Sequence, residues 1–404
     1  MSRRLAAQAE VARALDAVEP AAERASDRDT GRASLLTLED MLVPERNSFG
    51  VVRLILALAV LVSHAVWLTT GRHELEPVFG WTGYTLGQHA VQVFFVLSGI
   101  LVAQSIARSQ SLADYAAARA LRIFPALIVC VLATALVLGP FVKQLPAGAY
   151  FADPGVAAYV VKTISLATGS ATLPGVFDDV PAAGAVNTSL WTLKYEVICY
   201  AILAAAGAVA ILTQAWRAVT IAGFAVWAVI VFAAPVGVEV GSASSSLHTL
   251  RYFMLFFGVG VLAYALRSYV IVHGAMVLAL AFMFIGAIGS RFEEAAAAVF
   301  LGYAALWIAT LKFGGLRAYA NANDYSYGTY IYSMPVTQVL VMAIPGMTIF
   351  ALVPLATAVT LVLAFLSWEF IERPALTRRH ALADAVRRAF GDAGAWAKGR
   401  RRPV

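Results

Sequence analysis

The chain has 404 residues, of which 60% are hydrophobic and 13% are charged, and its formal net charge is +6. A soluble domain is about 45–50% apolar and about 25% charged, so this composition excludes an ordinary soluble protein. It indicates an all-α integral membrane protein, because the apolar segments are long, whereas the strands of a membrane barrel alternate in polarity over short stretches.

The first segment, residues 1–47, is polar and rich in alanine and arginine. We expect a mostly disordered cytoplasmic tail, because such a composition cannot bury enough apolar surface to fold. The segment lacks the early apolar core of a secretory signal. Within it, the stretch AAQAEVARALDAVEPAAERA, residues 6–25, predicts a weak amphipathic helix.

Residues 48–376 contain the apolar segments, and we interpret them as one transmembrane domain. A spanning helix needs about 20 mostly apolar residues. On that scale the sequence predicts a bundle of about ten transmembrane helices, near 50–70, 90–107, 119–140, 190–212, 217–235, 248–267, 270–289, 294–312, 326–345 and 348–371. The stretch 155–172 is apolar but short and holds Lys162, so we expect an interfacial or re-entrant segment there.

Basic residues predict the orientation of the bundle, because cytoplasmic loops are enriched in lysine and arginine. With an even number of spans both tails share one side, and both are rich in arginine, including the basic tail 377–404. The loops on that side carry Arg108, Arg119, Arg122, Arg217, Arg267, Lys312 and Arg317, against Arg72, Lys143, Lys162, Lys194 and Arg291 on the other. We therefore expect both termini in the cytoplasm, and the positive charge needs no nucleic-acid partner.

Arg53 and His64 interrupt the apolar stretch VVRLILALAVLVSHAV, residues 51–66. They are eleven residues apart, which is almost three helical turns, so they share a helix face and lie about 16 Å apart along the axis. Titratable groups within a bilayer are costly and usually mark function. The shared face favours a common cavity over two alternatives, a snorkelling arginine and a histidine bonded to a neighbouring helix.

The next two segments carry a small-residue pair and an arginine pair. In GQHAVQVFFVLSGILVAQS, residues 87–105, Ser98 and Gly99 predict close approach of another helix. In DYAAARALRIFPAL, residues 114–127, Arg119 and Arg122 are neighbours on one helix face. Two guanidinium groups fixed together can bind phosphate oxygens in pairs. The alternative is that the arginines only anchor the helix at the cytoplasmic surface.

Cys130 and Cys199 lie within apolar runs and are not spaced as Cys-x-x-Cys. We expect buried small side chains rather than redox or zinc ligands. The sequence gives no reason to predict a metal site.

Several motifs occur in a characteristic order. Arg53-x10-His64 is followed by FFVLSGIL, RALRIFPAL, SLWTLKYEVICY (189–200), DYSYGTYIYSMPV (324–336) and SWEFIERPAL (367–376). In this order they resemble the membrane acyltransferase-3 family, over about residues 48–376. One departure is Ser333, because many members have a histidine after the corresponding Tyr-[Ile/Leu]-Tyr segment.

The resemblance implies an O-acyltransferase of the bacterial inner membrane. It implies transfer of an acyl group, usually acetyl from cytoplasmic acetyl-CoA, to a hydroxyl of a cell-surface or exported saccharide, with no permanently bound cofactor. Membrane lipid is a further expected partner, and a homo-oligomer stays open. His64 is the expected general base. The expected acyl-CoA-binding residues are Arg53, Arg119 and Arg122, and those on the acceptor side or in support are Glu196, Trp191, Ser98 and Tyr330.

Other interpretations stay open at this point. His64 could instead form a covalent acyl intermediate, and Glu196 could be a polar cap paired with Lys194. Glu372, beside Arg373, is expected to be structural. The long outer segment 141–189 is expected to be a lid or a binding surface. A transporter or flippase of glycans, or a non-catalytic scaffold, remains an alternative, and neither the acceptor nor the choice of acetyl over succinyl follows from the sequence.

Overall fold

A computed structural model describes residues 36–109, 111–167, 172–213, 216–233 and 246–390. All of them except Leu36 belong to the second of two compact units, Thr37–Val404, and the description concerns this unit alone. The helix predicted within residues 6–25 lies outside the described residues, as does the end of the basic tail, 391–404.

The regular secondary structure of the described residues is helical, apart from two isolated β-bridges. This confirms the predicted all-α class. The α-helices are α2 (Leu38–Met41), α3 (Phe49–Thr70), α4 (Phe79–Thr82), α5 (Leu86–Arg108), α6 (Leu112–Leu132), α7 (Gly139–Val142), α8 (Ala147–Ala152), α9 (Pro154–Ile164), α10 (Trp191–Thr213), α11 (Trp216–Ala233), α12 (Ser246–Ala265), α13 (Gly274–Ala287), α14 (Glu293–Thr310), α15 (Gly315–Ala322), α16 (Ser326–Ala343), α17 (Ile349–Ser367), α18 (Arg373–Thr377) and α19 (Arg379–Phe390). Shorter 3₁₀ segments are η1 (Pro44–Arg46), η2 (His73–Leu75) and η4 (Thr188–Leu190), and the π-helical segments are η3 (Ala133–Leu138) and η6 (Trp368–Glu372).

Among the described residues, six helical runs are long and apolar enough to cross a membrane. They are Phe49–Thr70, Leu86–Arg108, Leu112–Val142, Thr188–Ala208, Ser246–Ala265 and Ile349–Thr377. The count becomes seven if α14 and α15, bent by 117° to one another, form one span. The chain is therefore a multi-pass membrane protein with helices at all ten predicted segments, while ten membrane crossings and the cytoplasmic termini stay predictions.

The described parts of segment 141–189 and of the basic tail also contain helices. Helix α9 has 11 residues, too few to span a bilayer, and it packs against α6. Helix α19 also packs against α6, where Arg387 lies 3.6 Å from the buried carboxylate of Asp114. Residues 379–390 of the basic tail thus lie against the helical domain.

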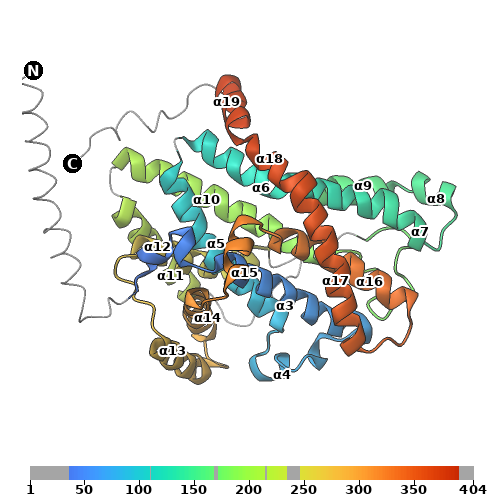
Figure 1. The fold of residues 1–404 in the computed structure, drawn as a ribbon, viewed down its shortest axis with the longest axis horizontal. Coiled ribbons are helices and arrows are strands. Elements are labelled where there is room, and N and C mark those ends of the chain that lie inside the picture. Colours follow the sequence, from blue (N-terminus) through green and yellow to red (C-terminus); the bar gives the residue numbers. More distant parts are fainter. Residues whose placement is uncertain (1–35, 110, 168–171, 214–215, 234–245, 391–404) are drawn as a thin grey trace, which may run out of the picture. The chain divides into compact units, whose positions relative to one another are not determined.

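Helices α3 and α5 form the centre of the arrangement that positions the site. Helix α3 packs against α5, α16 and α17, and α5 packs against α12 (Figure 1). The contact between α5 and α12 depends on glycine. A Cβ atom at Gly99 would collide with the carbonyl oxygen of Phe257, and one at Gly260 would collide with that of Val96. This confirms the packing predicted for Gly99, since only glycine lets the two backbones approach so closely.

A buried carboxylate holds the connection between α3 and α5. Glu76 accepts a hydrogen bond of 2.8 Å from the Ser63 hydroxyl and one of 2.6 Å from the backbone N–H of Leu86, the first residue of α5. Thr85 and Gln88 cap the same helix by bonding to each other's backbone N–H. Glu76 therefore fixes the start of α5 against the turn of α3 that carries His64.

The two cysteines are free and buried, as predicted.

Candidate functional site

Arg53 and Arg122 are held by carboxylates from distant parts of the chain. Arg53 of α3 and Arg122 of α6 both lie 2.6 Å from the same oxygen of Asp324, in the turn between α15 and α16. Arg122 also lies 3.1 Å from Glu372, at the end of η6. Glu372, with 2% of its side chain exposed, accepts a further hydrogen bond from Ser367. The expectation of a structural Glu372 agrees with this role as an anchor for Arg122.

Asp324 is ionised in this arrangement. Burial raises the pKa of its carboxyl, but the guanidinium groups of Arg122 and Arg53 outweigh that effect. Hydrogen bonds from the hydroxyl and backbone N–H of Ser326 lower it further, so the pKa of Asp324 falls to about 2. The pair of arginines is thus locked around one negative charge.

Arg119 differs from the other two predicted arginines. Its guanidinium lies 5.8 Å from the centre of the Tyr200 ring and 3.5 Å from the Ser105 hydroxyl. Among the described residues it has no carboxylate within ion-pair distance. Of the three, Arg119 is therefore the one whose charge stays available to an anion.

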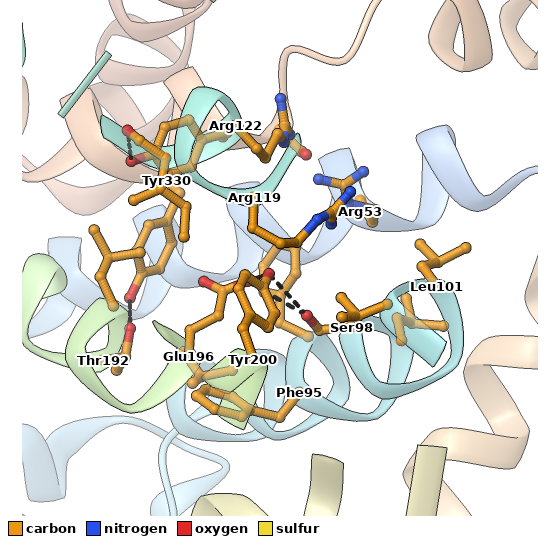
Figure 2. Close-up of a pocket in the computed structure, with 18 residues that line it drawn as sticks. Arg53, Phe95, Ser98, Leu101, Arg119, Arg122, Thr192, Glu196, Tyr200 and Tyr330 are labelled. Carbon is orange, nitrogen blue, oxygen red and sulfur yellow. Dashed lines mark hydrogen bonds between the residues drawn. The ribbon is translucent and has the colours of Figure 1, made fainter. Parts of the chain in front are cut away.

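All three arginines line one cavity of about 250 Å³, which we call the arginine cavity. Figure 2 shows it with Ser98, Glu196 and Tyr200 gathered on one wall. Glu196 accepts hydrogen bonds from the hydroxyls of Tyr200 and, at 3.4 Å, Ser98. Much of the remaining wall is apolar, formed by Val91, Phe94, Phe95, Leu97, Leu101 and Val102.

These positions bear on two expectations about Glu196. It forms no ion pair with Lys194 among the described residues, and Lys194 lies instead over the ring of Tyr195. Glu196 and Ser98 line the same cavity as the three arginines, and their expected role on the acceptor side or in support stays a prediction.

His64 lines a second cavity of about 790 Å³, which we call the histidine cavity. Its Nδ1 lies 3.4 Å from the hydroxyl oxygen of Ser189, a buried residue of η4. Trp191 lines this cavity, as do Trp67 and His73, whose rings stack with their centres 4.6 Å apart. Burial lowers the pKa of His73, which favours its neutral form. Lys194, Tyr195 and Tyr252 complete much of the remaining wall.

Arg53 and His64 therefore do not share a common cavity, and the prediction that they do is wrong. The two cavities adjoin, because Val91, Thr192 and Tyr330 line both of them. The Tyr330 hydroxyl lies 2.6 Å from the Thr192 hydroxyl and donates a hydrogen bond of 2.6 Å to the Ser189 carbonyl (Figure 2 shows the Thr192 contact). These contacts place side chains between the two cavities, which helix periodicity alone could not reveal.

A third cavity, of about 200 Å³, adjoins the arginine cavity on another side. It shares Arg53 and Leu101 with the arginine cavity, and Gln104, Arg108 and Asp324 line it as well. The three cavities thus form a series that passes from Arg108 by way of Arg53 and Tyr330 to His64.

Two residues of this site, Asp324 and Ser189, were not predicted from the sequence. Asp324 could have been predicted as a partner for the arginines. It is an acidic residue shortly before an apolar segment, on the side of the bundle that is rich in arginine. Nothing in the sequence indicated a role for Ser189 in the site, because a serine before an apolar helix is expected as a cap. Ser333 is fully buried and its hydroxyl donates a hydrogen bond of 3.2 Å to the Tyr330 carbonyl.

Comparisons with known proteins identify the family of the chain. A family model described as an acyltransferase domain, Acyl_transf_3, matches residues 46–369. An O-acetyl transferase from Shigella phage Sf6 is 32% identical over 345 residues, covering 82% of this chain and 96% of its own. Nodulation protein 10 from Rhizobium leguminosarum bv. viciae is 30% identical over 366 residues, covering 83% of this chain and 95% of its own. No solved structure matches. The chain belongs to the acyltransferase-3 family.

Proposed function

We propose that this protein transfers an acyl group, acetyl in the simplest case, from acyl-CoA to a hydroxyl group of a cell-surface or exported saccharide, with His64 as general base. The donor reaches the site from the cytoplasm, and the acceptor reaches it from the opposite side of a bacterial inner membrane. The observation that carries the proposal is that the arginine cavity and the histidine cavity meet at Val91, Thr192 and Tyr330.

The arginine cavity suits the donor. Arg119 supplies a guanidinium without a carboxylate partner, and Arg53 and Arg122 are held in place beside it. A guanidinium binds oxygen atoms through several donors at once, which favours an anionic or carbonyl-rich ligand. The bias of basic residues toward this side of the bundle supports a cytoplasmic donor.

The histidine cavity suits a saccharide. Its wall combines large aromatic rings, including those of Trp67, Trp191 and Tyr195, with the polar groups of Glu74 and Lys194. Sugars offer an apolar ring face and a polar edge, and tryptophan and tyrosine likewise combine an apolar body with a polar tip. The cavity volume falls within the range of small-molecule sites, about 300–1,000 Å³.

The reaction needs a base beside the acceptor hydroxyl. The hydroxyl oxygen attacks the thioester carbonyl, His64 takes the hydroxyl proton, an ester bond forms and the carbon–sulfur bond breaks. The proton then passes from His64 to the departing sulfur. When Ser189 accepts the Nδ1 proton of His64, Nε2 is left free to act as the base. The name of the phage relative, an O-acetyl transferase, supports acetyl as the group and oxygen as the acceptor atom.

The test is replacement of His64 by glutamine, which keeps polarity but cannot take up a proton. We expect His64→Gln to lower the transfer rate roughly 10²–10⁴-fold, the usual contribution of general base catalysis. The measurement is the acetyl mass increment on a saccharide acceptor supplied with acetyl-CoA and the purified full-length chain.

The matched control is His380→Gln, which changes an exposed histidine outside the cavities. It should leave the rate unchanged. Near-normal transfer by a folded His64→Gln variant would refute the assignment. A transporter or flippase, the alternative function, would move glycans without consuming acetyl-CoA at all.

A further inference from the structure

The arginine cavity is poorly suited to hold many negative charges. Arg53, Arg119 and Arg122 line it, but Asp324 and Glu372 already pair with two of them. A third carboxylate, that of Glu196, lies in the wall itself. The formal charges therefore cancel, and a group of phosphates here would lose its hydration without a matching excess of positive charge.

The same cavity is suited to a slender, uncharged chain with amide groups. Most of its wall is apolar, while Arg119, Ser98 and Thr192 provide scattered hydrogen-bonding groups. The part of acyl-CoA that has this character is the pantetheine arm, which carries the thioester at its tip.

The third cavity has the opposite character. Arg108, the last residue of α5, is exposed and forms no ion pair with any described residue. Arg53 contributes a second guanidinium, and Asp324 is the one carboxylate in this wall. The cavity thus has one positive charge in excess, at a place where phosphate groups can keep part of their hydration.

The third cavity and the arginine cavity also adjoin in the order in which acyl-CoA carries its phosphates and its pantetheine arm. Arg53 and Leu101 line both, so a ligand whose phosphates lie beside Arg108 can extend past Arg53 into the arginine cavity. From there its tip can approach Tyr330, which borders the cavity of His64.

From this arrangement we infer that the third cavity is the phosphate subsite of the donor. Arg108 binds the phosphates of the nucleotide part of acyl-CoA, and the arginine cavity holds the pantetheine arm. The inference rests on the proposed function for its donor, and it gives Arg108 a role that anchoring at a membrane surface does not require.

The test compares the binding of two probes, coenzyme A and pantetheine, to the purified full-length chain by calorimetry. Pantetheine has the arm but neither the nucleotide nor its phosphates. A hydrogen bond to a charged group accounts for roughly 10–100-fold in affinity. We expect Arg108→Ala to weaken coenzyme A binding by about that factor and to leave pantetheine binding unchanged, and Arg108→Lys to retain part of the affinity for coenzyme A.

Arg378→Ala is the matched control, because it removes one exposed arginine that lines none of the three cavities. It should change neither affinity. Unchanged binding of coenzyme A to Arg108→Ala would overturn the inference, as would equal weakening of both probes or a wild-type chain that binds no coenzyme A. The result is independent of catalysis, so it can be told apart from a failure of His64 as the base.

Discussion

Arg53 and His64 belong to the same helix, about 16 Å apart along its axis, but they line different cavities that meet at the Tyr330 side chain. This relationship separates the predicted donor region from the predicted acceptor region. In the proposed mechanism, the acyl group passes this boundary between the cavities to reach the imidazole.

Added bulk at this boundary should block transfer without preventing donor binding. Val91 lines both cavities from α5 and is partly exposed to them. We expect Val91→Phe to lower the transfer rate about a hundredfold, because even a displacement of about 1 Å of reacting groups can cost that much. Steady-state transfer and coenzyme A affinity, measured on the same preparation, check this.

Val91→Ala, which widens the boundary instead, is the control and should retain transfer. The explanation would be wrong if Val91→Phe transferred acetyl at the normal rate. It would also be wrong if this variant lost coenzyme A binding in parallel with activity, because the bulk would then act on the donor cavity itself.

Asp324 should make the stability of the folded protein depend on pH in the acid range. Its pKa in the folded chain, about 2, lies below the ordinary 3.8. Its stabilising effect is therefore complete above about pH 4 and is lost as the pH falls toward 2. We expect Asp324→Asn to lower the free energy of unfolding by about 3 kcal/mol at pH 7, since it leaves Arg53 and Arg122 without their shared partner.

Thermal unfolding in detergent, followed from pH 7 to pH 2, measures this difference. The difference in the free energy of unfolding between wild type and Asp324→Asn should stay constant down to about pH 4. It should decrease below that pH, because a protonated Asp324 resembles asparagine. Glu369→Gln, which breaks an exposed pair with Arg373, should change stability by less than about 1 kcal/mol. A difference that stayed constant to pH 2 would contradict the ionisation described for Asp324.

The crossing of α5 and α12 should not tolerate a methyl group. We expect Gly99→Ala to destabilise the protein by about 1–3 kcal/mol, since overpacking forces the backbones apart. Gly286→Ala in α13 is the matched control, because a Cβ there meets no atom within 4 Å and alanine favours a helix. Thermal unfolding of both variants checks the prediction, and equal stability of the two would show that the crossing is not tight.

Local patterns were sufficient for the helices and for four of the titratable side chains that line the cavities. The apolar runs predicted helices at all ten segments, and the interruptions by Arg53, His64, Arg119 and Arg122 marked side chains that do line cavities. They could not show how the arginines are paired. Asp324 lies 202 residues from Arg122 in the chain and Glu372 lies 250 residues away, so no local period relates them.

The partners of Glu196 also could not be predicted from the local sequence. Lys194 was the nearest opposite charge in the sequence, but residues two apart on a helix do not face each other. The carboxylate turns instead toward Tyr200, one turn further along α10, and toward Ser98 of α5.

The sequence alone determined that this is a helical membrane protein of the acyltransferase-3 type, because hydrophobic length and the order of motifs are local properties of the chain. Only the tertiary structure decided that the arginines and the histidine lie in adjoining cavities, and that Tyr330 and Thr192 lie between them. The physical reason is that a cavity boundary is made by side chains from several helices. Their packing depends on contacts such as that of Gly99 with α12, which joins residues far apart in the sequence.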